Sequence, residues 1–136
     1  MKKNVLNTDL TGKVAVVTGA GGVLCSYFAK VLARAGARVA LLDINELAAQ
    51  GYAEEIVAEG GIAKAYACNV LDKAACYGVA DRVASELGPC DILINGAGGN
   101  NPVRPPIRNI LNWAISTPKP NPSSIWNPKA LASFLI

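Results

Sequence analysis

The sequence predicts an α/β protein with a parallel, doubly wound sheet that is incomplete and is followed by an irregular C-terminal tail. Two observations predict this fold: four short apolar segments recur along residues 1–102, and helical patterns lie between them. Strand alternating with helix in this way typically gives a parallel sheet with right-handed connections. We therefore expect the order β-α-β-α-β-α-β.

The four apolar segments are residues 14–17, 39–42, 63–68 and 92–94. Each is short, and none alternates cleanly between apolar and polar residues. Strands that are covered on both faces of a parallel sheet have this pattern. We therefore expect strands of a parallel sheet that is covered on both faces.

Helical periodicity follows the first three of these segments. A stripe of apolar residues at i, i+4 spacing predicts a first helix that ends at Gly36. Asn45 is expected to cap a second helix that stops before Gly60, and Asp72 to cap a third that stops before Gly88.

The composition changes abruptly near residue 100. Beyond Gly99 there is no acid and no glycine, whereas seven of the 8 prolines and both tryptophans lie there. The net charge of +3 therefore belongs to the tail, because residues 1–99 carry −1 and residues 100–136 carry +4. We expect a domain at 1–102 and a Pro-rich basic tail at 103–136. The tail is either a binding arm or a segment without an evolved role, and we favour the second interpretation. No compositional feature of the domain favours nucleic acid or a membrane as a partner.

The residue counts also exclude several kinds of site. The chain has no histidine, which removes Ser-His-Asp and Cys-His nucleophiles and the usual zinc ligand sets, so no metal site is expected. The cysteines are too far apart for a CxxC pair, and we interpret them as reduced, mostly buried thiols. No apolar run is long enough to span a membrane, and the simplest expectation is a cytoplasmic protein. The four cysteines are Cys25, Cys68, Cys76 and Cys90.

A glycine-rich turn connects the first strand to the first helix. Backbone N–H groups in such a turn approach a pyrophosphate, which then lies at the positive end of the helix dipole. Asp43 ends the second strand, where an acid accepts hydrogen bonds from the adenosine ribose and repels a 2′-phosphate. This pattern predicts dinucleotide binding, with NAD favoured over NADP; Arg38 precedes the strand and is not expected to reach the ribose. Alternatively, the glycines only make a tight turn and Asp43 is an ordinary strand-end acid. The expected cofactor contacts are Thr18, Gly19, Gly21, Gly22, Val23, Leu24, Asp43 and Ile44.

Four motifs in the same order resemble the short-chain dehydrogenase/reductase family over residues 10 to 102. The segment from Leu10 to Gly19 is similar to that family's first strand, and Cys68-Asn69-Val70 resembles its Asp-Val element beside the adenine. Asn95-Gly96-Ala97-Gly98 resembles its Asn-Asn-Ala-Gly motif. The resemblance implies a Rossmann-type fold and an NAD(P)-dependent oxidoreductase. It adds six cofactor contacts: Asn69, Val70, Asn95, Gly96, Ala97 and Gly98.

The glycine turn departs from the family pattern Thr-Gly-x-x-x-Gly-x-Gly. Val23 and Cys25 stand at the second and third glycine positions, and Gly96 replaces the second asparagine of the later motif. The turn and residues 95–102 resemble a branch of sugar-acid reductases, the D-mannonate oxidoreductase (fructuronate reductase) type.

The resemblance implies a catalytic Tyr-x-x-x-Lys pair with an upstream Ser, and we expect this chain to lack these residues. None of the four tyrosines is followed by a lysine four positions later, and we assign no catalytic residue. In the segment from Ser26 to Lys30 the lysine is three positions after Tyr27, and we interpret that segment as structural. We therefore expect a truncated or frame-shifted chain, whose continuation was lost shortly after Pro102, and expect it to be inactive as it stands.

Two classes of function follow. The first is an oxidoreductase acting on a sugar acid or another carbonyl or alcohol, of which this chain preserves the cofactor half; its small-molecule substrate would bind only to a complete homologue. The second is a non-catalytic dinucleotide-binding or interaction module. In either case the fourth strand is expected to form an open edge, which the tail or a second copy of the chain would cover.

Overall fold

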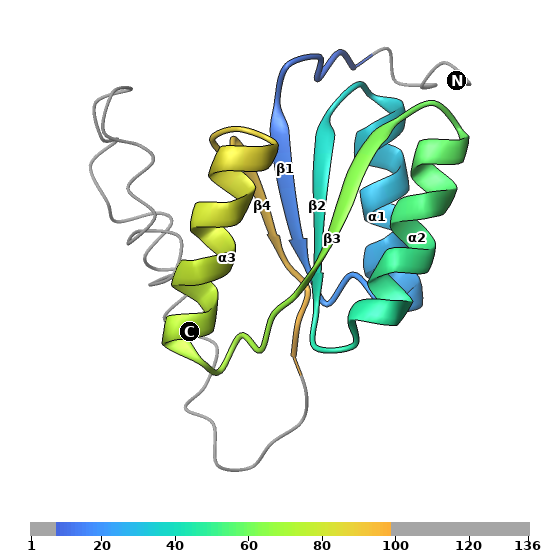
Figure 1. The fold of residues 1–136 in the computed structure, drawn as a ribbon. Coiled ribbons are helices and arrows are strands. Elements are labelled where there is room, and N and C mark those ends of the chain that lie inside the picture. Colours follow the sequence, from blue (N-terminus) through green and yellow to red (C-terminus); the bar gives the residue numbers. More distant parts are fainter. Residues whose placement is uncertain (1–7, 99–136) are drawn as a thin grey trace.

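The computed structural model describes residues 8–98 of the chain. Within them, four strands alternate with three helices, which confirms the expected order of elements (Figure 1). The elements are β1 (Val14–Thr18), α1 (Val23–Arg34), β2 (Arg38–Asp43), α2 (Glu46–Ala58), β3 (Ile62–Ala67), α3 (Lys73–Glu86) and β4 (Ile92–Asn95). The predicted tail at 103–136 and the domain limit at 102 lie outside the described residues.

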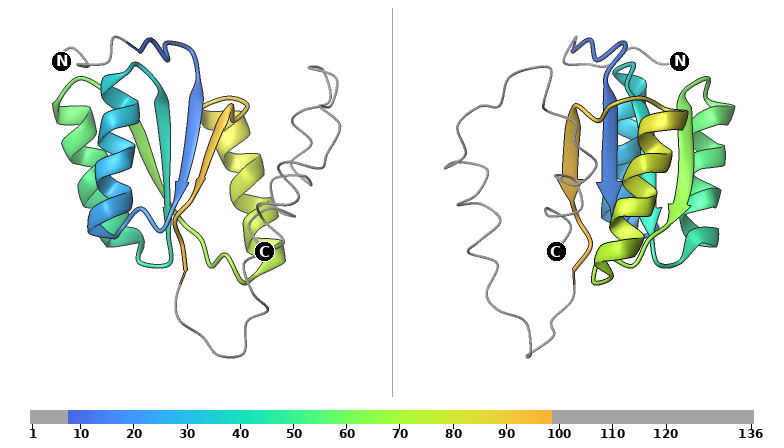
Figure 2. Two further views of the ribbon diagram at one scale, coloured as in Figure 1. Left: turned by 180° about the vertical axis from the view of Figure 1, so that it is seen from behind. Right: turned by 60° about the vertical axis from the view of Figure 1, so that its left-hand side comes forward.

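The four strands form one parallel sheet in the order β3-β2-β1-β4. The strand order reverses at β1, because β2 and β3 lie on one side of it and β4 on the other. Helices α1 and α2 cover one face of the sheet and α3 covers the other (Figures 1 and 2). The predicted doubly wound, Rossmann-type sheet is therefore confirmed.

Apolar side chains pack on both faces of β1 and β2. On one face, Ala15 and Val17 pack with alanines of α1 and α2, and on the other, Val14 and Val16 pack with α3. Every residue of β1 is buried, which explains why its sequence does not alternate. The small alanine side chains of α1 and α2 let these helices approach the sheet closely.

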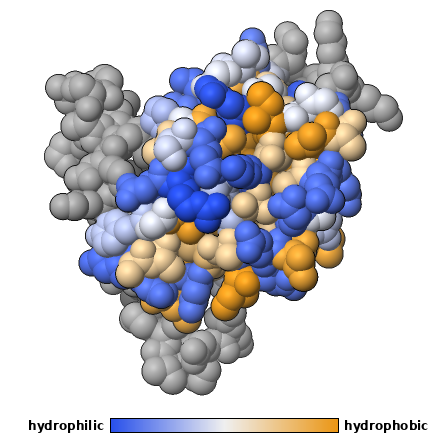
Figure 3. Space-filling model, in the orientation of Figure 1, coloured by the Kyte–Doolittle hydropathy of each residue, from blue (hydrophilic) through white to orange (hydrophobic). Residues whose placement is uncertain are grey.

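The expected cover on both faces is incomplete at β3 and β4, of which the fourth strand was itself expected to form an open edge. Ile62 in β3 is 56% exposed, and β4 has no fully buried residue. The reason is strand order: in the described part of the chain, β3 and β4 each pair with one strand only. Lys64 on β3 forms an ion pair with Glu86 of α3. The face of the molecule shown in Figure 3 mixes polar and apolar residues. A charged edge strand of this kind resists pairing with other chains.

The predicted helix ends are confirmed. The Asn45 side chain accepts a hydrogen bond from the backbone nitrogen of Ala48, and Asp72 accepts one from that of Ala75, each at 3.2 Å. Gly36, Gly60 and Gly88 follow the three helices with positive φ angles, which is the usual way to end a helix.

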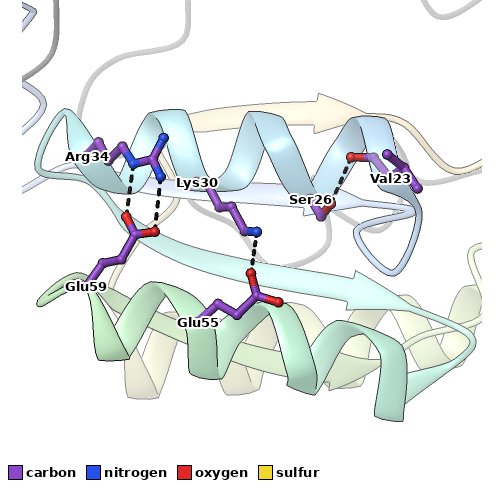
Figure 4. A network of polar contacts seen from close by, with 6 residues as sticks. All are labelled: Val23, Ser26, Lys30, Arg34, Glu55 and Glu59. Atoms are coloured by element: carbon purple, nitrogen blue, oxygen red, sulfur yellow. Dashed lines mark hydrogen bonds and ion pairs between the residues drawn. The ribbon is translucent and has the colours of Figure 1, made fainter. Parts of the chain in front are cut away.

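Polar contacts join α1 to α2 (Figure 4). Arg34 forms a bidentate pair with Glu59, and Lys30 pairs with Glu55 and lies 5.1 Å from the Tyr52 ring centroid. The hydroxyl of Ser26 donates to the carbonyl oxygen of Val23 at 2.8 Å. These contacts are consistent with the interpretation of the segment from Ser26 to Lys30 as structural. Each exposed ion pair contributes at most about 1 kcal/mol, so their main effect is to orient the two helices.

Candidate functional site

A cleft of ≈ 680 Å³ lies where the carboxyl ends of the four strands meet. The turn after β1, the end of β2 and the loops after β3 and β4 all contribute to its wall. Ligands of open parallel sheets bind at this edge, where the strand order reverses. The lining residues are Gly19, Gly22, Val23, Leu24, Cys25, Asp43, Ile44, Cys68, Asn69, Val70, Leu71, Gly96, Ala97 and Gly98.

The turn after β1 directs the amino end of α1 into the cleft. Gly19 has a φ of 70°, and a Cβ there would lie 2.8 Å from backbone atoms of Gly96 and Ala97. Glycine is therefore required at this position. Gly22 caps α1 without a side-chain hydrogen bond, and the first turn of the helix carries no acid. The first amides of a helix have no partner within it, so this end can bind an anion.

Asp43 holds its carboxylate at the same place. Its Oδ2 accepts a hydrogen bond from the backbone nitrogen of Gly21 at 2.9 Å, and its Oδ1 accepts one from that of Asn45 at 2.8 Å. A Cβ on Gly21 would lie 2.9 Å from the Asp43 carboxyl carbon, so this glycine makes room for the acid. The carboxylate is fixed from both sides and keeps lone pairs that can accept further donors.

Thr18 joins the glycine turn to the loop after β4. Its side chain is buried, and its Oγ1 accepts hydrogen bonds from the backbone nitrogens of Gly96 and Ala97, both at 3.1 Å. The hydroxyl also lies 3.5 Å from the carbonyl oxygen of Ile94, to which it donates. Thr18 does not line the cleft but holds the backbone of Gly96 and Ala97, which do.

The loop after β3 forms the opposite part of the wall. The side-chain oxygen of Asn69 accepts a hydrogen bond from the backbone nitrogen of Leu71 at 3.0 Å, which fixes a tight turn. Val70 packs partly against the core beside α3. Leu71 is 61% exposed, and Ile44 and Leu24 are exposed as well, so the rim of the cleft is apolar.

Most of the residues predicted to contact a cofactor come together in this cleft. The three that do not line it are Thr18, Gly21 and Asn95. Thr18 and Gly21 instead support the wall, and Asn95 ends β4 at an exposed position. The structure adds Cys25, Cys68 and Leu71 to the lining. Each of the three adjoins a predicted residue in the chain. Cys25 also stands at the third glycine position of the turn, and Cys68 belongs to the motif at residues 68–70.

The four cysteines are free and buried, as predicted. Burial raises the pKa of the Cys25 thiol, and the nearby Asp43 charge raises it further. Burial also raises the pKa of Cys68, and that of Cys90, to about 12. These groups remain protonated thiols at neutral pH, so none is a reactive nucleophile.

We expect the folded chain to resist alkylation. Iodoacetamide at pH 8 is allowed to react for the time that it needs to modify all four thiols of the urea-unfolded chain. In that time it should modify fewer than about one thiol per folded chain, because only the thiolate reacts. Mass spectrometry counts the adducts, and peptide mapping locates them. Rapid modification of Cys25 in the folded chain would contradict its burial in the cleft wall.

Among the described residues, the titratable side chains that line the cleft are Asp43, Cys25 and Cys68, and no tyrosine or lysine lines it. The Tyr66 hydroxyl donates to Glu86 at 2.8 Å, and burial followed by that hydrogen bond raises its pKa, so it is not an acid near neutral pH. Within residues 8–98 no group of three or more His, Cys, Asp or Glu could hold a metal ion. In the same residues, no helix has both the length and the apolar content that crossing a membrane requires.

Comparison with known proteins gives consistent relatives. The chain is 53% identical over 96 residues to an oxidoreductase of Haemophilus influenzae, covering 71% of this chain and 34% of that protein. It is 42% identical over 96 residues to the 7alpha-hydroxysteroid dehydrogenase of Escherichia coli K12, covering 71% of this chain and 38% of that enzyme. The chain thus spans little more than a third of the length of these relatives.

Solved structures show the same fold. A candidate D-mannonate oxidoreductase from Haemophilus influenza with bound NAD matches with a TM-score of 0.68 and 53% identity, over 71% of this chain and 34% of that one. A metagenomic short-chain oxidoreductase in complex with NADP matches with a TM-score of 0.63 and 39% identity, over 66% of this chain and 41% of that one.

The family model described as short chain dehydrogenase matches residues 13–112. That match includes all four strands and every segment that lines the cleft. The chain therefore belongs to the short-chain dehydrogenase family.

Proposed function

We propose that this chain binds NAD in the cleft at the carboxyl ends of its strands, as the cofactor-holding part of an oxidoreductase. The observation that carries the proposal is the arrangement of Asp43 and the glycine turn. The carboxylate is hydrogen-bonded to the turn itself, through the backbone nitrogen of Gly21, beside the uncapped amino end of α1. One rigid unit therefore offers amides for a pyrophosphate and an acceptor for ribose hydroxyls.

The charges at the cleft favour NAD over NADP. Among the described residues, Asp43 is the only charged side chain in the lining, and no lysine or arginine is there to bind a 2′-phosphate. Arg38 begins β2 and Asp43 ends it, so the arginine is at the other edge of the sheet, where it donates to the carbonyl oxygen of Gly12 at 3.4 Å. A 2′-phosphate would meet a carboxylate with no compensating cation.

The residues fit the cofactor without performing the chemistry. A bound NAD supplies a nicotinamide ring that accepts or donates hydride. In this chain, the turn at Gly19 and Gly22 and the amino end of α1 would hold the pyrophosphate. Asp43 would bind the ribose, Asn69 and Val70 would lie beside the adenine, and residues 95–98 would border the nicotinamide half. Because the sequence has no Tyr-x-x-x-Lys pair, we propose that it binds NAD without turnover.

We propose that a complete enzyme containing this cofactor-binding part acts on a sugar acid. The support is the similarity to the NAD-bound structure described as a candidate D-mannonate oxidoreductase, together with the Asn95-Gly96-Ala97-Gly98 motif.

A non-catalytic binding module is the second candidate. It is favoured by the absence of a Tyr-x-x-x-Lys pair from the sequence and by β4, which in residues 8–98 pairs with β1 alone. In this interpretation a second copy of the chain pairs along β4, and sedimentation would detect the dimer.

Calorimetric titration of the purified chain with NAD and with NADP tests the proposal. We expect saturable NAD binding, and NADP binding that is weaker by more than about tenfold, because like charges at one site cost several kcal/mol. An assay for NADH formation with D-mannonate should show no turnover. Equal affinity for both cofactors would contradict the role of Asp43, and turnover would contradict the absence of catalytic residues.

A further inference from the structure

Two cleft residues on different elements compete for the same space. A Cβ on Gly96 would lie 2.1 Å from the sulfur of Cys25 and 3.5 Å from its Cβ. The first distance is far inside a van der Waals contact, whereas the second is an ordinary one. The sulfur of Cys25 therefore leaves no room for a side-chain atom at residue 96 unless one of the two groups shifts.

Both residues belong to the wall of the cofactor cleft. Cys25 is the third residue of α1 and is only 9% exposed. Gly96 directly follows β4, and its backbone nitrogen is held by the Thr18 hydroxyl. The contact between them therefore links the helix end proposed for the pyrophosphate with the loop proposed for the nicotinamide half.

Both residues of the pair also depart from the family pattern, and the two departures lie opposite each other. Cys25 stands where that pattern has its third glycine, and Gly96 where it has its second asparagine. A larger side chain on the helix is matched by the loss of a side chain on the loop, so the total volume at the contact is partly conserved.

We propose that Cys25 is a positioning residue of the cofactor cleft, whose sulfur fills the space opposite Gly96 and sets the separation between α1 and the loop after β4. The role at a cofactor rests on the proposed function. The packing itself does not, because it involves only protein atoms of Cys25 and Gly96.

A double-mutant cycle with Cys25→Ala, Gly96→Ala and the combined variant tests this pair. The combined variant moves one heavy atom from residue 25 to residue 96, so it nearly conserves volume. Gly51→Ala is the control, because Gly51 lies in α2 and its Cβ would meet no atom within 4 Å. Urea unfolding is measured without ligand, and NAD affinity is then measured by calorimetry on each protein.

We expect Gly96→Ala to raise the unfolding equilibrium constant roughly 5- to 150-fold, the range for overpacking a filled site. Adding Cys25→Ala to the Gly96→Ala chain should lower the unfolding equilibrium constant again by at least about fivefold. A coupling of this size is typical of residues in contact. The carbonyl oxygen of Thr18, 2.8 Å from the same Cβ, leaves a residual penalty. NAD affinity should fall in Gly96→Ala and recover in the combined variant, whereas Gly51→Ala should leave it unchanged.

Additive effects in urea would overturn the proposal, because the sulfur would then not determine the space at residue 96. So would a Gly96→Ala protein as stable as the wild type, since the thiol would simply have turned away. If Gly96→Ala does not fold but the combined variant does, the result supports the proposed contact between Cys25 and Gly96. If neither variant folds, the Thr18 carbonyl oxygen and not the Cys25 sulfur excludes a side chain at residue 96, and the proposal is overturned. Strong coupling in urea without NAD binding by any variant or the wild type would overturn the proposed function and the role at a cofactor, but not the packing.

Discussion

Asp43→Asn is expected to weaken NAD binding by roughly 10- to 100-fold, because hydrogen bonds to a charged group contribute about 1.5–3 kcal/mol each. The amide has one oxygen in place of two, so its NH₂ group must face the backbone nitrogen of Gly21 or that of Asn45, both of which are donors. NADP binding should fall less, since the charge that repels its 2′-phosphate is removed. Calorimetry on both cofactors measures the change, and an unchanged NAD affinity would contradict the assignment.

Asp91→Asn provides the matched control for this variant. Asp91 accepts a hydrogen bond from the backbone nitrogen of Val14 at 2.9 Å and lies 3.8 Å from the Lys13 ammonium nitrogen. These contacts are at the opposite edge of the sheet, where β1 and β4 begin. The substitution should lower the free energy of unfolding by about 1–3 kcal/mol and leave NAD affinity unchanged. The comparison separates loss of the cleft carboxylate from general loss of stability.

Gly19→Ala is expected to lower the free energy of unfolding by about 2–5 kcal/mol and to abolish cofactor binding. Part of the cost arises because φ is 70° at this residue, a conformation that disfavours any Cβ. The rest arises because the Cβ would lie 2.8 Å from the backbone of Gly96 and Ala97, which cannot move while Thr18 holds it. Urea unfolding and calorimetry measure the two effects.

Gly12→Ala separates these two contributions. Gly12 has a φ of 81°, but a Cβ there would meet no atom within 4 Å. The substitution should cost only the backbone part, about 1–2 kcal/mol, and should preserve NAD binding. Equal losses in the two variants would show that the close approach of the turn to residues 96–97 contributes nothing.

The order of elements and the place of the candidate site were predictable because both depend on position along the chain. Asn45 and Asp72 cap helices by local hydrogen bonds, which spacing alone reveals. Asp43 and the glycine turn each follow a strand, and parallel strands bring such residues to one edge of the sheet.

The direction of individual side chains was not predictable in the same way. Thr18 lies at the expected turn, but its hydroxyl is directed to the loop after β4, 78 residues later in the chain. The contact between Cys25 and Gly96 likewise depends on two segments that only the sheet brings together. The edge position of the fourth strand was expected, whereas the exposure of β3 follows from strand order, which a run of apolar residues does not encode.

The central claim, that this cleft binds NAD, is tested most directly by the backbone amide NMR spectrum of the isotope-labelled chain during titration. NAD should shift the amide resonances of residues 19–25, 43–44, 69–71 and 96–98, which surround the cleft. A second hollow lies between α2 and β3, near Lys64 and Arg82. The amide resonances of the residues that line it should not shift. Shifts confined to that second hollow, or none at saturating NAD, would contradict the claim.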